Sequence, residues 1–245
     1  MIDPLLLSVT KVSTFKCEQL LTNASGFFFA RDEGLFLVTS RHVLCDETSQ
    51  HFPDAIRIEL HTDENNVTKA VDLVIPLYED GKSVWRQGSD STGDVDVAAI
   101  EINQDVLPVD VVYRAFDTER LMGSSYVEVG SALLVIGFPL GFHDTLHHLP
   151  IARQAILASC FDLRFQGYGY FLTDARTHRG MSGAPVVMRS DRDDDETDRF
   201  PWMLAGIHSA RLDVGTRDLQ HDEVLGLNCA WFSDILTTLT DASEP

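Results

Sequence analysis

The chain has 245 residues, with 38 acidic and 19 basic side chains, and its formal charge at pH 7 is −19. This excess of negative charge argues against nucleic acid and anionic membrane surfaces as partners, because both are bound through basic patches. With 44% hydrophobic and 23% charged residues, the composition is that of a folded globular protein and excludes a disordered chain.

The start of the sequence lacks the basic region and the apolar run of a signal peptide. The longest apolar stretch, at 132–136, is far too short to cross a membrane. The four cysteines lie far apart and form no CxxC pair, which is typical of reduced thiols. We therefore expect a cytoplasmic protein with no membrane segment.

Short runs of β-forming residues alternate with turn residues along most of the chain, which predicts an all-β fold. Residues 26–30 and 35–38 flank a turn that contains Gly34, and they are typical of a hairpin. Further strands are predicted at 55–61, 68–76, 96–102, 127–137, 151–159, 168–173, 184–188, 203–209 and 224–227. One closing helix is predicted at about 229–240 from the spacing of Ala230, Trp231, Ile235 and Leu239.

Polar segments separate these strands. Residues 79–93 and the acidic run at 191–198 are predicted to be exposed loops. Residues 108–124 have a weak strand pattern and could link two halves of about six strands each. The sequence therefore favours a layout of two barrels.

Three segments carry residue types that together can do chemistry. His42 directly follows a predicted strand, Asp96 opens another, and Ser182 lies in the glycine-rich turn Arg179-Gly-Met-Ser-Gly-Ala-Pro185. A serine hydroxyl becomes a useful nucleophile only when a base such as histidine accepts its proton, and a carboxylate can orient that base. The chain order His, Asp, Ser is that of chymotrypsin-type proteases, and not of subtilisins or α/β-hydrolases.

A second aspartate competes for the carboxylate role. Asp94 and Asp96 project to the same side of a strand, because side chains alternate along it. We favour Asp96, which directly precedes the apolar run, and keep Asp94 as the alternative.

At these motifs the chain resembles the trypsin/chymotrypsin-like serine peptidases, especially the bacterial glutamyl endopeptidases and high-temperature-requirement proteases. The resemblance extends from about residue 26 to 231 and includes the turn Gly137-Phe-Pro-Leu-Gly-Phe142. It implies two six-stranded antiparallel Greek-key barrels packed together, with a C-terminal helix and an active site in the cleft between them. Residues 1–110 would carry His42 and Asp96, and residues 111–245 would carry Ser182.

The resemblance also assigns roles to neighbouring residues. The backbone N–H groups of Gly180 and Ser182 would form the oxyanion hole, and the hydroxyl of Ser209 would bond the aspartate. Arg176, Thr177 and His208 lie where the family builds its specificity pocket. Glutamyl endopeptidases have a threonine and a histidine at two of these positions, which implies cleavage after Glu or Asp. The alternative is a small apolar pocket beside ordinary strand and turn residues.

The chain departs from secreted trypsins just before the serine. Met181 replaces the acidic residue that pairs with a new N-terminus in members activated by cleavage. We therefore expect an enzyme of narrow or regulated activity, controlled for instance by a protein partner, with a protein or peptide as substrate. A catalytically silent binding module is the alternative from another class.

No cofactor or metal is expected. His143 and His147 are four residues apart, a spacing that chelates zinc on a helix, but Gly141 and Pro150 nearby disfavour a helix there.

Overall fold

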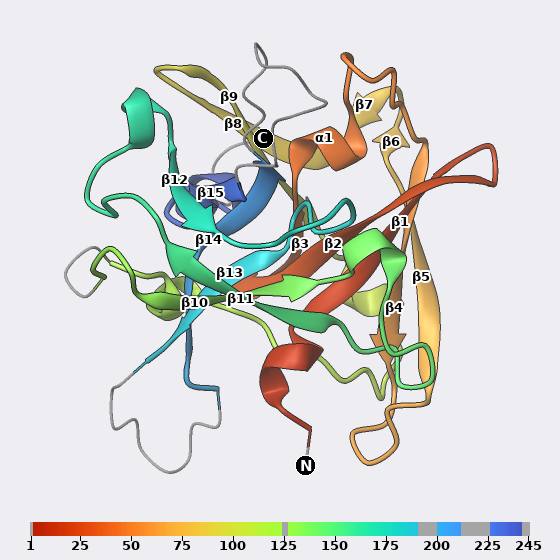
Figure 1. Ribbon diagram of the computed structural model, residues 1–245. Coiled ribbons are helices and arrows are strands. Elements are labelled where there is room, and N and C mark those ends of the chain that lie inside the picture. The colour runs from red at the N-terminus through yellow and green to blue at the C-terminus, as the bar shows by residue number, and fades with distance from the viewer. Residues whose placement is uncertain (1, 124–126, 191–199, 212–225, 242–245) are drawn as a thin grey trace, which may run out of the picture.

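The computed structural model describes residues 2–123, 127–190, 200–211 and 226–241. These residues form two antiparallel β-sheets that pack against each other, and the predicted all-β fold is confirmed. In Figure 1, β1 and β2 (red) pass close to β10 (green), where the two halves meet.

The first sheet has seven strands in the order β5-β4-β1-β2-β3-β9-β8. This sheet therefore has one strand more than the six predicted for the first barrel. The strands are β1 (Val9–Lys16), β2 (Gln19–Arg31), β3 (Gly34–Thr39), β4 (Ala55–His61), β5 (Ala70–Pro76), β8 (Trp85–Asp90) and β9 (Gly93–Glu101). A separate two-stranded hairpin joins β6 (Tyr78–Glu79) to β7 (Lys82–Ser83).

The second sheet closes into a barrel of six strands in the order β10-β11-β12-β15-β14-β13. Its strands are β10 (Ala132–Gly137), β11 (Ile151–Leu157), β12 (Tyr170–Asp174), β13 (Pro185–Arg189), β14 (Trp202–Arg211) and β15 (Leu227–Phe232). Closure leaves no strand edge unpaired around the barrel. The predicted strand at 224–227 and the acidic run at 191–198 lie wholly or largely outside the described residues.

Helices are short. The α-helices are α1 (Arg41–Leu44) and α2 (Ile235–Leu239), and the 3₁₀ turns are η1 (Pro4–Leu7), η2 (Gln104–Val106), η3 (Thr118–Arg120), η5 (Pro139–Gly141) and η6 (Phe165–Gly167). In the part of the chain that the structure describes, no helix has the length and apolar character needed to span a bilayer.

The predicted closing helix at 229–240 is wrong over its first half. Residues 227–232 form β15, which pairs with β12 on one side and β14 on the other. A strand that is bonded on both sides and buried is apolar almost throughout, so its pattern does not alternate and can imitate helical spacing. The helix itself is α2, and it places Leu236 and Leu239 in the core.

Two strands of the first sheet were not predicted. Strand β8 lies in the segment 79–93 that we expected to be a loop, because its outer face is polar and mainly Trp85 is buried. Strand β1 buries Thr10, Ser13 and Thr14 among its apolar residues, and these polar side chains are hydrogen bonded. Its hydrophobic alternation is weak for that reason.

A shared apolar core joins the halves. Phe27 and Phe29 of β2 belong to the same buried cluster as Ile207 and Trp231 of the barrel. Phe116 in the connection between the sheets is fully buried in this cluster and meets Phe27 edge-on at 5.7 Å between ring centroids. The predicted domain boundary at 110/111 falls in this connection and stays a prediction.

A polar contact also crosses between the halves. Glu59 on β4 lies 2.6 Å from Lys11 Nζ and 3.1 Å from Nδ1 of His148, in the loop between β10 and β11. Burial raises the pKa of Glu59, but the hydrogen bonds and charges of Lys11 and His148 outweigh burial and hold this pKa below its ordinary value of 4.5.

This contact makes stability depend on pH. Because the pKa of Glu59 is lowered by folding, the carboxylate stabilises the fold above pH 4.5, and the stabilisation is lost as the pH falls through the folded pKa. We expect Glu59→Gln to lower the free energy of unfolding at pH 7 by about 1–3 kcal/mol, since it leaves the partly buried ammonium of Lys11 without its charged partner. Urea denaturation at pH 7 and at about pH 3.5 measures this, and the deficit should shrink at the lower pH.

The matched control is Glu101→Gln, which breaks the exposed pair with Arg86 and should cost less than about 0.5 kcal/mol. A deficit in Glu59→Gln that stays constant with pH would contradict the prediction.

Candidate active site

The imidazole of His42 is held by a single helical turn. Helix α1 begins two residues after β3, and its Val43 and Leu44 are buried in the first sheet, so His42 is left partly exposed at the surface of that sheet. The backbone N–H of His42 donates to Oδ1 of Asp96 at 2.8 Å. This bond fixes the helical turn relative to β9.

Asp96 of β9 contacts the ring as well. Its Oδ2 lies 2.7 Å from His42 Nδ1 and also accepts a hydrogen bond from the hydroxyl of Ser209 on β14. Asp94, the alternative from the sequence, is mostly exposed and lies 3.5 Å from Arg41. Asp96 is therefore the aspartate that contacts His42, in a position to keep the ring proton on Nδ1.

Ser182 approaches the other side of the ring. Its Oγ lies 2.9 Å from His42 Nε2 and 3.1 Å from the carbonyl oxygen of Ser209. Because Nδ1 carries the proton toward Asp96, Nε2 of the neutral ring presents a lone pair to the serine hydroxyl. The structure thus brings His42, Asp96, Ser182 and Ser209 into one hydrogen-bonded cluster.

The turn that carries Ser182 depends on glycine. Gly180 and Gly183 have φ of +91° and +82°, which side chains with a β-carbon rarely adopt. A Cβ at Gly183 would also lie 2.3 Å from the carbonyl oxygen of Ser25 in β2. Between them, Met181 is fully buried in the apolar core of the barrel.

The N–H groups of Gly180 and Ser182 have their directions fixed by the carbonyls of the preceding residues, which accept hydrogen bonds. Arg179 O accepts from Leu140 N at 2.6 Å, and Met181 O accepts from Ala184 N at 3.0 Å. In a trans peptide the N–H points opposite to the carbonyl, so these two bonds fix the direction of the N–H groups of Gly180 and Ser182. Neither N–H donates to any acceptor among the described residues.

The electrostatic setting favours a charged imidazole. Burial lowers the pKa of His42, but the hydrogen bond and the charge of Asp96, together with the charge of Asp46, raise it above 6.5. The ring is therefore a stronger base than a free histidine.

The three residues predicted to bind substrate are not equivalent. Thr177 and His208 are buried, whereas Arg176 is exposed and forms no hydrogen bond or ion pair with the described residues. The hydroxyl of Thr177 donates to Oδ1 of Asn228 at 2.5 Å. His208 precedes Ser209 on β14, and its backbone carbonyl accepts from Gly183 N at 2.8 Å.

Asn228 was missed by the sequence analysis. It is fully buried on β15, and its amide nitrogen donates to the carbonyls of Ala175 at 2.8 Å and Gly226 at 2.9 Å. The sequence signal that could have found Asn228 was a single amide side chain in the otherwise apolar strand Leu227–Phe232.

The three side chains of the histidine-rich loop contact separate partners. His147 contacts Asp144 at 2.7 Å and His148 contacts Glu59, while His143 Nδ1 lies 2.6 Å from the carbonyl of Gly141. Over the described ranges, no three His, Cys, Asp or Glu side chains gather as metal ligands would.

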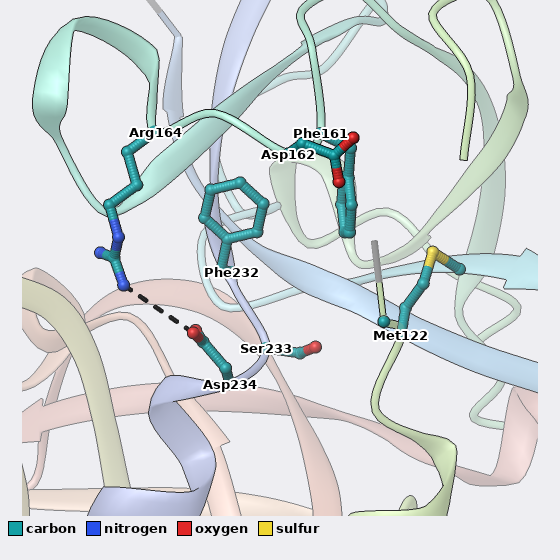
Figure 2. Close-up of a pocket in the computed structure, with 8 residues that line it drawn as sticks. Met122, Phe161, Asp162, Arg164, Phe232, Ser233 and Asp234 are labelled. Carbon is teal, nitrogen blue, oxygen red and sulfur yellow. Dashed lines mark ion pairs between the residues drawn. The ribbon is translucent and has the colours of Figure 1, made fainter. Parts of the chain in front are cut away.

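A cavity of about 330 Å³ lies on the barrel, apart from this cluster. Figure 2 shows Phe161 and Phe232 on its walls and the ion pair of Arg164 with Asp234 at one side, 3.8 Å apart. Its described lining residues include none of the residues around His42.

Comparisons with known proteins identify the family of the chain and the fold that it shares with solved structures. Residues 24–192 match the model of the trypsin-like peptidase domain. No curated protein sequence matches the chain significantly.

Solved structures share the fold. A serine endoprotease from Yersinia pestis is 18% identical with a TM-score of 0.54, over 95% of this chain and 61% of that one. The HtrA-type protease AlgW with a tripeptide is also 18% identical, with a TM-score of 0.56 over 95% and 58% of the two chains. The active form of the Rv3671c protease from M. tuberculosis is 14% identical, with a TM-score of 0.53 over 97% and 82%.

The chain therefore spans about three fifths of the first two structures, and the likeness to all three is one of fold. The domain match covers more than half of the chain and includes His42, Asp96 and Ser182. The protein belongs to the trypsin-like peptidase family.

Proposed function

We propose that the protein is a serine endopeptidase that hydrolyses peptide bonds through His42, Asp96 and Ser182. The observation that carries this proposal is the unbroken chain of contacts from Asp96 Oδ2 through the imidazole of His42 to Ser182 Oγ, at 2.7 and 2.9 Å. Both distances lie within hydrogen-bond reach, as general base catalysis needs.

In the proposed reaction, Ser182 Oγ attacks the carbonyl carbon of the substrate while His42 Nε2 takes the hydroxyl proton. The imidazolium then gives this proton to the leaving amine as the C–N bond breaks, which leaves an acyl-enzyme. Water adds to the acyl carbon with His42 again acting as the base, and the serine recovers its proton as the acid product leaves.

Asp96 would act by holding the ring and stabilising its positive charge. Ser209 would keep the carboxylate in place through its hydroxyl. The N–H groups of Gly180 and Ser182 are the proposed oxyanion donors, since their directions are fixed and they have no described acceptor.

The proposed activity does not require cleavage of the chain. Met181 is apolar and fully buried, so it offers no carboxylate to a new N-terminus. Control by a protein partner is part of the proposal, and a catalytically silent binding module is the alternative function.

We further propose a preference for Glu or Asp before the scissile bond, supported by the burial of His208, whose backbone carbonyl is bonded to Gly183 next to Ser182. The hydroxyl of Thr177 already gives its proton to Asn228, and Arg176 is exposed. A substrate carboxylate needs charge-assisted donors. The preference must then depend on His208 more than on Thr177.

Labelling with a fluorophosphonate tests the activated serine. We expect the wild-type protein to be labelled, and Ser182→Ala and His42→Ala to lose at least about 1,000-fold in labelling rate, because both are needed to form the bond. Mass spectrometry should place the adduct on Ser182. Ser190→Ala is the control and should label normally, because Ser190 directly follows the end of β13 that is far from Ser182.

Absence of labelling in folded wild-type protein would contradict the proposal and favour the binding module. Labelling restored by a protein partner would instead support regulated activity.

The rate of labelling should fall with acidity, because the protonated imidazole cannot accept a proton. The pKa of His42 is raised, so the midpoint should lie above pH 6.5. Proton NMR titration of His42 in Ser182→Ala should report a raised pKa as well. In Asp96→Asn this pKa should drop below 6.5, since burial then acts with little opposition.

A panel of peptides that differ only before the scissile bond tests the preference. We expect Glu to be cleaved at least about tenfold faster than Gln, measured as kcat/KM, as a charge-assisted bond would give. His208→Ala should remove this ratio, whereas Thr177→Val should largely keep it. Preferred cleavage after an aliphatic or basic residue would overturn the acidic preference and leave the triad proposal untouched.

A further inference from the structure

Ser25 lies on β2 of the first sheet but bonds to the turn of the barrel that carries Ser182. It is fully buried. Its backbone N–H donates to the carbonyl of Ser182 at 3.0 Å. Its hydroxyl donates to the carbonyl of Gly180 at 2.7 Å and accepts from the N–H of Phe138 at 3.0 Å.

These bonds complete the set that fixes the turn. The carbonyls of Arg179 and Met181 accept hydrogen bonds from the N–H groups of Leu140 and Ala184. The carbonyl between them, of Gly180, is held by the Ser25 hydroxyl. Every peptide that could reorient the two proposed oxyanion donors is therefore tied through its carbonyl.

Ser25 itself has no room to move. The hydroxyl of Thr39 donates to its carbonyl at 2.8 Å. A Cβ on Gly137 would lie 2.4 Å from its Oγ, and one on Gly183 would lie 2.3 Å from its carbonyl oxygen. The hydroxyl is thus fixed by close packing on both sides, which is what a positioning group requires.

We propose that Ser25 is a positioning residue that holds the N–H groups of Gly180 and Ser182 toward the oxyanion of the reaction. This inference rests on the proposed peptidase function. The hydroxyl of Ser25 touches no reacting atom. It acts through the carbonyl of Gly180 and through Phe138, the residue before the turn η5 whose Leu140 holds the carbonyl of Arg179.

The physical reason lies in what happens when the hydroxyl is removed. The Gly180 carbonyl and the Phe138 amide both lose a buried partner, which is costly for either group. The peptide between Gly180 and Met181 then rotates more easily, because the hydrogen bond to its carbonyl is lost. Such a rotation changes the direction of the N–H groups of both Gly180 and Ser182. Donors must be aimed before the reaction to stabilise the developing charge.

The test compares Ser25→Ala with Ser8→Ala. Ser8 is also fully buried, and its hydroxyl also donates to a backbone carbonyl, that of Leu5, at 2.7 Å. We expect Ser25→Ala to lower kcat and the fluorophosphonate labelling rate about 10- to 100-fold, less than loss of an oxyanion donor itself. KM should stay within about twofold of wild type, because it does not depend on the oxyanion donors. The pKa of His42 measured by NMR should stay within about 0.3 of the wild-type value for the same reason. Ser8→Ala should label within about twofold of wild type.

A second pair of variants covers a failure of Ser25→Ala to fold. Ser25→Thr keeps the hydroxyl and Ser25→Val has the same shape without it, and Thr should label at least about tenfold faster than Val. Equal rates in this pair, or an undiminished rate in folded Ser25→Ala, would overturn the role of Ser25. Wild-type protein that is not labelled at all would instead overturn the proposed function.

Discussion

The proposed active site depends on the close approach of two backbones, β2 of the first sheet and the glycine turn of the barrel. His42 and Asp96 come from one side of this seam and Ser182 from the other. The approach needs a glycine at position 183, where φ is +82° and a Cβ would meet the Ser25 carbonyl at 2.3 Å. A shift of the sheets by an ångström would separate the base from the nucleophile while leaving each sheet folded.

Apolar and polar contacts have different effects where the two sheets meet. The shared cluster of Phe27, Phe116 and Trp231 buries large aromatic surfaces, which supplies free energy but little directional control. The bonds made by Ser25 and Thr39 are directional and fully buried, so an altered register would leave polar atoms unpaired. The aromatic core therefore holds the sheets together, and the hydroxyls define how they meet.

The sequence predicted the parts of the site that are local in the chain. His42 after a strand and Ser182 between two glycines are short patterns, and each is recognisable within a few residues. Ser25 and Asn228 were missed because their partners are distant, 155 residues away at Gly180 and 51 away at Thr177. The substrate-binding roles of Arg176, Thr177 and His208 stay predictions, as do the catalytic roles of the triad. In the fold, β1 was not predicted because its buried threonines weaken the alternation of apolar and polar residues. Strand β15 was predicted as part of a helix because it is paired on both sides and buried, which removes this alternation.

The contact of Ser182 with two acceptors has a consequence for the second half of the proposed reaction. The hydroxyl has one proton, and both Nε2 of His42 and the Ser209 carbonyl lie within its reach. Once Oγ is acylated it has no proton to give, so both acceptors lose their donor at the same moment. A water molecule has two protons and can satisfy both. Acylation would thus leave two unpaired acceptors beside the ester, and a water molecule bound to both would be placed to hydrolyse the ester.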